Sequence, residues 1–345
     1  MQKIRFGVVG TNFITDWVVA GGREDARFEA VAVCSRSGER GKAYAAKHGI
    51  PHAFTSLEAM AASPLIDAVY IASPNVCHAS QSILCMKHGK HVLCEKPFAS
   101  NAAEVRQMRK AAAGHRVVLM EAMKPTLTPG FRALQAALPE IGALRQYFAC
   151  YCQYSSRYDK LKEGIVLNAF QPELSNGAVM DIGVYTLYPM VALFGRPRAI
   201  QAFVVKLPSG VDGHGSVNFA YDNGFNATVL YSKIADSRLP TEIQGENGRI
   251  TLDRINIIGD VTLTYRNGVS KKLLSRVEKN EYYYEVAEFI DLIQSGRSES
   301  AVNSLENSLI TLEIMDEIRR QAGIVFPADQ RSLRNEFPKE VDLVK

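Results

Sequence analysis

The first third of the chain alternates short apolar segments with longer polar ones, and this alternation constrains the fold more than any other feature. Five segments have the apolar composition of strands: residues 4–9, 28–34, 67–72, 91–94 and 117–120. Segments with helical patterns separate them. Strands that alternate with helices of about ten to fifteen residues indicate a parallel, doubly wound sheet with helices on its faces.

Capping signals mark where several of these helices begin and end. Thr55 and Glu58 have capping-box spacing before a short helix, and Asn101 and Glu104 open a later helix in the same style. A polar helix is predicted through Lys47, and another is predicted from His78 to His88, ending at Gly89.

The first strand runs directly into a glycine turn, where a doubly wound sheet binds its ligand. Counted from Gly10 in G-x-G-x-x-G register, Asn12 replaces the second glycine and Thr15 the third. Asn is the non-glycine residue that most readily adopts positive φ, so we expect Asn12 to preserve the turn. The turn and the helix that follows it predict a pyrophosphate site. The residues expected there are Gly7, Gly10, Thr11, Asn12, Phe13 and Ile14.

The end of the second strand indicates which dinucleotide binds. A ribose with a free 2′-hydroxyl usually meets Asp or Glu at this position, but here Ser35 is followed by Arg36. A hydroxyl and a guanidinium suit a 2′-phosphate. We therefore predict NADP as the cofactor, with NAD as the alternative.

Two later strand ends carry the motifs that identify a family. Ser73-Pro74-Asn75 with His78 follows the third predicted strand, and Glu95-Lys96-Pro97 follows the fourth. A third segment, Gly177 to Tyr185, has the pattern G-A-x-x-D-x-G-x-Y. In these motifs and in their order the chain resembles the Gfo/Idh/MocA family of glucose–fructose oxidoreductases and inositol dehydrogenases. With a tyrosine at position 185, the motif is most similar to that of the dimeric dihydrodiol dehydrogenase-like members of the family.

The resemblance implies roles for individual residues. Ser73, Pro74, Asn75 and His78 would lie along the cofactor, and Glu95 would approach the nicotinamide ribose. Lys96 would contact both the nicotinamide end and the substrate oxygen. Its bond to Pro97 is a candidate cis peptide, because X-Pro bonds tolerate cis at a cost of only about 0.5–1 kcal/mol.

After about residue 122 the pattern changes to that of a second domain. Apolar residues alternate over 147–154, and Asp222-Asn223-Gly224 is a hairpin signal between two further strands. We predict an NAD(P)-binding Rossmann domain over 1–122. The substrate and dimerisation domain is predicted over 123–345, as an α+β domain with a large, open, mostly antiparallel sheet, and the C-terminal tail is expected to return to the Rossmann domain. The family resemblance implies a homodimer or homotetramer formed through this sheet.

The expected chemistry is hydride transfer to or from a secondary alcohol or ketone of a sugar, a cyclitol or another polyol, or a dihydrodiol. We predict Tyr185 as the proton donor or acceptor, with Lys96 orienting the substrate oxygen. Lys96 itself as the acid/base is the alternative. Asp181 lies four residues before Tyr185, so on a helix it would share a face with it and position the substrate or Lys96. A predicted loop with Tyr154, Arg157 and Tyr158 is a candidate cover for the substrate, or an ordinary polar loop. A non-catalytic dinucleotide sensor on the same fold is the alternative function.

Composition limits the other classes of function. The formal net charge is only +4, without a dense Lys/Arg stripe, so we expect no nucleic-acid partner. We expect no membrane partner, since no uninterrupted apolar run reaches about 18 residues. The six cysteines form no CxxC pair and the seven histidines have no ligand spacing, so we predict reduced thiols and no metal. The N-terminus lacks a signal-peptide layout, and a cytoplasmic location is expected.

Overall fold

The computed structural model describes residues 2–274 and 278–333. Contacts between residues divide the chain into two compact units. The first comprises Met1–Ala122, Lys279–Ser308 and Gln330–Lys345, and the second comprises Met123–Glu278 and Leu309–Asp329. The predicted boundary between residues 122 and 123 remains a prediction, and the end of the expected returning tail, 334–345, lies outside the described residues.

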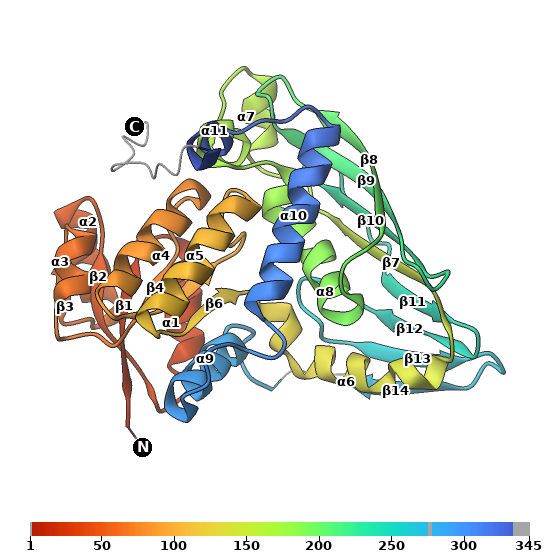
Figure 1. Ribbon diagram of the computed structural model, residues 1–345, viewed down its shortest axis with the longest axis horizontal. Coiled ribbons are helices and arrows are strands. Elements are labelled where there is room, and N and C mark those ends of the chain that lie inside the picture. The colour runs from red at the N-terminus through yellow and green to blue at the C-terminus, as the bar shows by residue number, and fades with distance from the viewer. Residues whose placement is uncertain (1, 275–277, 334–345) are drawn as a thin grey trace. The chain divides into compact units, whose positions relative to one another are not determined.

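A six-stranded parallel sheet forms the centre of the first unit, which confirms the predicted Rossmann fold (Figure 1). Its strand order is β3-β2-β1-β4-β5-β6. The strands are β1 (Ile4–Val9), β2 (Phe28–Cys34), β3 (His52–Phe54), β4 (Ala68–Ile71), β5 (His91–Glu95) and β6 (Leu119–Ala122). The sixth strand begins two residues later than the pattern predicted. Between β1 and β4 the strand order reverses direction, and such a switch point is where a doubly wound sheet binds its ligand.

Helices cover the first sheet, and polar side chains cap several of them. They are α1 (Phe13–Gly22), α2 (Gly38–His48), α3 (Leu57–Ala62), α4 (His78–Lys87), α5 (Ala102–His115) and α9 (Tyr283–Ser295). Asn101 caps α5 as predicted, its side chain accepting the Glu104 N–H. The prediction for α3 was wrong by one residue. Ser56, not Thr55, is the N-cap, since its hydroxyl accepts the Ala59 N–H.

Helix α9 packs with the first unit although it follows the second in the chain. Val286, Phe289 and Ile290, which share one face of the helix, are fully buried. The ring of Phe289 lies 6.0 Å from that of Phe6 on β1. The late helix therefore completes the core around the first strand.

An eight-stranded sheet dominates the second unit, and only its β7–β10 pair is parallel. This confirms the predicted large, mostly antiparallel sheet, with strand order β14-β13-β12-β11-β7-β10-β9-β8. The strands are β7 (Leu144–Cys152), β8 (Ala199–Lys206), β9 (Asp212–Ala220), β10 (Asn226–Ser232), β11 (Thr241–Gly245), β12 (Gly248–Leu252), β13 (Val261–Tyr265) and β14 (Ser270–Leu274). The predicted Asp222-Asn223-Gly224 hairpin joins β9 to β10.

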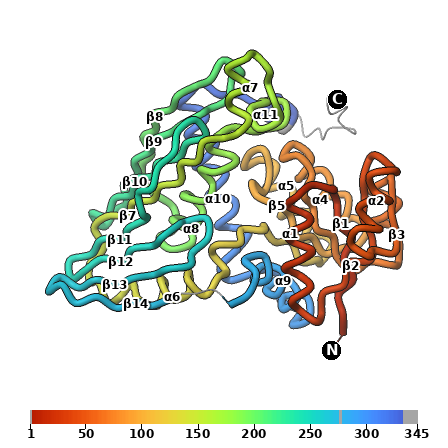
Figure 2. Tube along the Cα trace, turned by 180° about the vertical axis from the view of Figure 1, so that it is seen from behind, coloured from red at the N-terminus to blue at the C-terminus, as the bar shows by residue number. Residues whose placement is uncertain are grey.

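The two faces of this sheet differ. Helices α6 (Pro129–Ala137) and α8 (Val184–Phe194) lie on one face, seen from opposite sides in Figures 1 and 2. Val217 and Phe219 of β9 are buried on the face toward the core. On β8, Phe203 and Val205 are 63% and 48% exposed, and they pair with residues that alternate with the buried ones. These two apolar side chains are accessible, and their partners on β9 are the polar residues Ser216 and His214.

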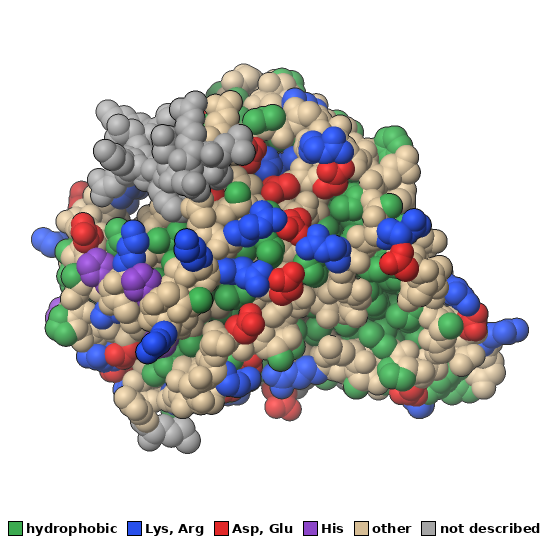
Figure 3. Space-filling model, in the orientation of Figure 1, with side chains coloured by type: hydrophobic (Ala, Val, Ile, Leu, Met, Phe, Trp, Pro, Cys, Tyr) green, Lys and Arg blue, Asp and Glu red, His purple; other side chains and the backbone are tan. Residues whose placement is uncertain are grey.

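One helical run, Pro172–Phe194, is long and apolar enough to span a membrane by length and composition alone. Of its most apolar window, 72% is buried inside the protein, as in the core helix of a globular domain. In Figure 3, Lys and Arg side chains lie interspersed with Asp and Glu on the visible face. The small positive excess is therefore not gathered into one patch on that face.

Candidate functional site

The glycine turn lies at the switch point of the first sheet. Gly10 has φ +109°, and a Cβ built on it would lie 2.9 Å from the carbonyl oxygen of Ala72, at the end of β4. The Gly10 N–H also donates to the Cys34 carbonyl oxygen at the end of β2 (3.1 Å). A side chain at this position would therefore be both strained and in collision, which explains the glycine.

Asn12 supports the turn differently from the prediction. It does not adopt positive φ: its φ is −96°, and it is the N-cap of α1. Its side-chain oxygen accepts the N–H groups of Ile14 (2.9 Å) and Thr15 (3.2 Å), and its amide nitrogen donates to the Ala72 carbonyl oxygen (3.0 Å). Within the described residues, the N–H groups of Thr11 and Phe13 make no hydrogen bond. Together with the N–H of Asn12, which also makes no hydrogen bond among the described residues, these donors are available to an anion, whereas the N–H of Ile14 is not.

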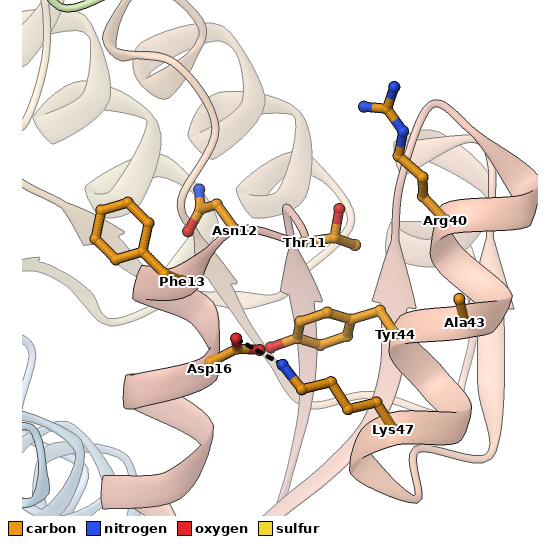
Figure 4. Close-up of a pocket in the computed structure, with 8 residues that line it drawn as sticks. All are labelled: Thr11, Asn12, Phe13, Asp16, Arg40, Ala43, Tyr44 and Lys47. Atoms are coloured by element: carbon orange, nitrogen blue, oxygen red, sulfur yellow. Dashed lines mark hydrogen bonds and ion pairs between the residues drawn. The ribbon is translucent and has the colours of Figure 1, made fainter. Parts of the chain in front are cut away.

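A hollow of about 310 Å³ lies beside this turn, near the lower end of the usual size of ligand pockets, about 300–1,000 Å³. It is lined by Thr11, Asn12, Phe13, Asp16, Arg40, Ala43, Tyr44 and Lys47 (Figure 4). Asp16 and Lys47 form an ion pair across it. Burial acts to raise the pKa of Asp16, but the hydrogen bonds from Lys47 and His48 bring it below its ordinary value.

Two arginines are available at the 2′-phosphate end of this region. Ser35 is half-buried at the end of β2, and Arg36 is exposed. Arg40, which the sequence reasoning missed, lies in the first turn of α2 and reaches the hollow. Neither guanidinium forms an ion pair within the described residues. A cation near a helix N-terminus is unfavourable with respect to the helix dipole. The position of Arg40 in the sequence was therefore a signal for an anionic ligand.

His78 joins the two turns that carry the family motifs. Its side chain is only 1% exposed, and its ring nitrogens lie 2.9 Å from the Pro97 carbonyl oxygen and 2.8 Å from that of Ser73. Burial lowers the pKa of the ring. Ser73 is held in turn by its hydroxyl, which donates to Gln81 (2.7 Å). Pro74 and Asn75 follow in this turn, and Asn75 begins a short 3-10 helix. His78 therefore links the turn at Ser73 to the turn at Pro97 through its two ring nitrogens.

The Glu95-Lys96-Pro97 turn is fixed at its start by Glu95. This buried carboxylate accepts the Tyr70 hydroxyl through Oε1 and the Lys96 N–H through Oε2 (3.2 Å). Lys96 is half-buried, and the Lys96–Pro97 bond is cis, as the sequence suggested. The carboxylate holds the backbone from which the Lys96 side chain departs.

A second carboxyl, Glu121 on β6, holds the far side of the same turn. Its Oε1 accepts the N–H of Phe98 (3.0 Å), and the residue is fully buried. Burial raises the pKa of Glu121 to about 7, although hydrogen bonds to Ser308 and Phe98 act in the opposite direction. Near neutral pH this carboxyl is therefore close to its midpoint.

The raised pKa of Glu121 predicts a pH-dependent difference in stability. Ionisation of Glu121 is unfavourable in the folded state. Its contribution to the free energy of unfolding is therefore complete below about pH 4.5 and is lost as pH rises to about 7. In Glu121→Gln, which keeps an acceptor for Phe98, this loss is absent. Relative to wild type, the variant should gain about 3 kcal/mol between those pH values. Denaturant unfolding of both proteins across this range checks it, and a difference independent of pH would contradict it.

In the second unit, the Gly177–Tyr185 segment is anchored by Asp212 at the start of β9. The Asp212 carboxylate accepts the Val179 N–H (2.7 Å), and a Cβ on Gly177 would lie 2.3 Å from Asp212 Oδ1. Gly177 also has φ +143°. A Cβ on Gly183 would meet the Tyr231 ring at 3.2 Å. Both glycines of the motif therefore let other groups approach the helix backbone closely.

Gly177→Ala tests this anchor. Positive φ at a non-glycine residue costs about 1–3 kcal/mol, and here the collision with Asp212 adds to it. Gly164→Ala is the matched control, since Gly164 has φ +83° but nothing lies within 4 Å of its Cβ position. We expect thermal unfolding to show a clearly larger loss for Gly177→Ala. Equal losses would mean that the contact with Asp212 is unimportant.

Asp181 and Tyr185 lie in consecutive helical segments. Asp181 is in a π-helical turn, η6 (Val179–Gly183), and Tyr185 is in the first turn of α8. Such π turns occur frequently at functional sites. Asp181 accepts a hydrogen bond from the buried Lys233, and the Tyr185 ring packs edge-on against Tyr151 at 5.7 Å. Sequence reasoning missed Lys233, because its place beside Asp181 depends on the β9–β10 hairpin.

The predicted substrate loop is partly helical. Tyr154 and Arg157 precede α7 (Tyr158–Lys162), so Tyr158 lies in a short helix and not in a loop. The rings of Tyr154 and Tyr158 contact each other at 5.6 Å, and Tyr158 lies 6.0 Å from Phe170. Phe170 also lies under the Lys233 ammonium, 5.5 Å away. The structure thus gathers aromatic rings next to the Asp181 segment.

The candidate site residues are divided between the two units. The residues predicted for the cofactor and Lys96 belong to the first, whereas Asp181, Tyr185 and the Tyr154–Tyr158 region belong to the second. All six cysteines are free, with Cys150 Sγ and Cys152 Sγ 3.7 Å apart. Among the described residues, no group of three or more His, Cys, Asp or Glu is placed to hold a metal.

Comparison with known families agrees with both units. Residues 4–123 match a family described as "Oxidoreductase family, NAD-binding Rossmann fold". Residues 134–251 match the GFO/IDH/MocA C-terminal domain. The two matches lie on either side of the division between the units.

Two curated proteins are similar over nearly their whole length. The scyllo-inositol 2-dehydrogenase (NADP(+)) IolU of Bacillus subtilis is 52% identical over 95% of this chain and 99% of its own. The human trans-1,2-dihydrobenzene-1,2-diol dehydrogenase is 29% identical over 96% of this chain and all of its own.

Solved structures share the fold at lower identity. The 3-ketoreductase KijD10 from Actinomadura kijaniata, in complex with NADP and TDP-benzene, has a TM-score of 0.81 at 21% identity, covering 92% of this chain and 98% of its own. An aldose-aldose oxidoreductase from Caulobacter crescentus has a TM-score of 0.83 at 20% identity, covering 93% and 98%. These likenesses support the two-domain fold.

Proposed function

Because this chain belongs to the Gfo/Idh/MocA oxidoreductase family, we propose that it is an NADP-dependent dehydrogenase or reductase acting on a cyclitol, sugar or dihydrodiol. The reacting group is a secondary alcohol or the corresponding ketone. The observation that carries the proposal is the end-to-end similarity, at 52% identity, to an NADP-dependent scyllo-inositol dehydrogenase. Among the substrate classes, a cyclitol is therefore favoured.

The first unit fits a dinucleotide. Gly10, at φ +109°, allows the tight turn after β1 beside the end of β4, and the N–H groups of Thr11 and Phe13 are available to the pyrophosphate. Ser35, Arg36 and Arg40 supply a hydroxyl and two guanidinium groups for a 2′-phosphate, although Glu39 lies next to Arg40 in the first turn of α2. This donor set favours NADP over NAD.

The protein's own residues then have separate roles in the reaction. The bound nicotinamide supplies or accepts the hydride. Lys96, held by Glu95, binds and polarises the substrate oxygen. Tyr185 accepts or donates the hydroxyl proton. Asp181 orients the substrate by accepting a hydrogen bond from a second hydroxyl of the substrate. The alternative, with Lys96 as the acid/base, uses the same contacts.

A non-catalytic sensor on the same fold is the weaker alternative. Lys96, Asp181 and Tyr185 are all present, and the Bacillus subtilis and human relatives described above are named as dehydrogenases. Six free cysteines also suit a reducing compartment, which supports a cytoplasmic location.

We also propose that two chains pair through the eight-stranded sheet. Its accessible face carries Phe203 and Val205, and exposed apolar patches often mark interfaces. Phe203→Glu should shift the protein toward monomer in analytical ultracentrifugation. Leu239→Glu, a change at another exposed apolar residue outside the strands, is the control. A wild-type monomer at all concentrations would contradict the proposal.

The function is tested by a turnover screen with purified protein. Scyllo-inositol, an aldose and a trans-dihydrodiol are each offered with NADP⁺ and with NAD⁺, and formation of the reduced nicotinamide is followed. We expect turnover of at least one substrate, with NADP⁺ preferred about tenfold or more in kcat/KM. NADPH binding without turnover of any substrate would contradict the enzymatic proposal.

A further inference from the structure

The carboxylate of Asp181 is paired with a lysine that the family motif does not contain. Lys233 is only 4% exposed, and its ammonium donates to Asp181 Oδ2. The Phe170 ring covers the same ammonium, 5.5 Å away. Removing an ammonium from water is unfavourable, so a buried ammonium persists only where it is paired.

Asp212 faces Lys233 from the neighbouring strand. The Lys233 N–H donates to the carbonyl oxygen of Gly213, the residue after Asp212 (2.8 Å). Burial raises the pKa of Asp212 to about 6, while the charge of Lys233 acts to lower it. The ammonium therefore interacts with two carboxyl groups: the buried Asp212, and Asp181, whose side chain is 38% exposed.

We infer that Lys233 and Asp212 are positioning residues for Asp181. Asp212 holds the helix backbone through the Val179 N–H, two residues before Asp181, and Lys233 holds the Asp181 carboxylate itself. The arrangement fixes both the place and the negative charge of that carboxylate. The inference rests on the proposed function, because it takes Asp181 to contact the substrate.

The pairing decides what Asp181 does. An ionised carboxylate accepts hydrogen bonds and donates none. Held in that form by Lys233, Asp181 accepts a hydrogen bond from a hydroxyl of the substrate and does not serve as the general acid. The expected substrate therefore carries a hydroxyl besides the reacting group, as a diol or polyol does, and the proton remains with Tyr185 or Lys96.

The test removes the charge of Lys233. Lys233→Met eliminates the ammonium, Lys233→Arg restores a cation, and Lys206→Met removes an exposed lysine of the same unit as the control. If methionine prevents folding, Lys233→Gln makes the same comparison with a polar side chain. Two readouts are taken: the pH profile of kcat/KM, and the NMR titration of the Asp181 carboxyl in protein labelled with ¹³C-aspartate, assigned with Asp181→Asn.

In Lys233→Met we expect the Asp181 carboxyl signal to titrate about one pH unit or more higher, because a neighbouring cation favours the ionised form. The acid limb of kcat/KM should move upward with it, NADPH affinity should be unchanged, and arginine should reverse part of the shift. An Asp181 titration unchanged by Lys233→Met would overturn the inference, and so would a loss of activity equal at every pH. If the wild type turns over no substrate, the proposed function fails, while the NMR titration still decides the pairing.

Discussion

Replacing Lys96 with methionine is expected to lower kcat by about 10²–10⁴-fold, the range that positioned acid–base groups contribute. Lys96 lies in the turn after β5, where Glu95 holds its N–H and Glu121 holds the N–H of Phe98. Methionine has a similar length but neither charge nor donor. The turn should therefore keep its shape while the contact to the substrate oxygen is lost.

Two measurements separate this effect from misfolding. NADPH affinity, followed by fluorescence titration, should change little, because the pyrophosphate and 2′-phosphate contacts lie at other strand ends. Lys87→Met, which alters an exposed lysine in the last turn of α4, should match wild type in both assays. Normal turnover in Lys96→Met would show that Lys96 is not a catalytic residue.

Replacing Arg36 and Arg40 together by alanine is expected to reverse the choice of cofactor. A hydrogen bond to a charged group contributes about 1.5–3 kcal/mol, or about tenfold to a hundredfold in affinity for each arginine. The affinity of the double variant for NADPH should fall by most of this combined amount. NADH has no 2′-phosphate, so its affinity should change little.

Lys42→Ala is the matched control for the loss of positive charge. Lys42 is exposed on α2 two positions after Arg40, and residues two apart on a helix do not face each other. It should leave the ratio of NADPH to NADH affinity unchanged. If the double variant loses affinity equally for both cofactors, the arginines do not contact the 2′-phosphate.

The first unit was predictable because its signals are local. Apolar runs, caps and glycine turns are encoded over a few residues, and β1, β2 and the helix capped by Asn101 follow them closely. Where neighbouring residues compete, the local signal is ambiguous. Ser56 and Thr55 both have capping side chains, and only the surrounding structure selects Ser56. At Asn12 the conformational preference suggested positive φ, but capping Ile14 and Thr15 favours the extended form.

The supporting residues of the site were less predictable, because their contacts are distant in sequence. Lys233 lies 52 residues from Asp181, and Asp212 lies 33 residues from Val179. No periodicity connects such pairs, since the order of strands in the sheet brings them together. Glu121 had no signal, because it lies just beyond the strand predicted at 117–120 and its role depends on β6 lying next to β5. The family motifs suggested Lys96, Asp181 and Tyr185, and they include Glu95, which accepts the Lys96 N–H, but they do not include Glu121, Asp212 or Lys233.

The most direct test of the central claim is to follow the hydride. A cyclitol that the enzyme oxidises is labelled with deuterium at the reacting carbon, and the reduced cofactor formed from NADP⁺ is analysed by mass spectrometry. The account predicts that the deuterium appears in the reduced nicotinamide, and that Lys96→Met forms very little of this product. Deuterium that remains in the product or is released to water would contradict hydride transfer from the substrate to the nicotinamide.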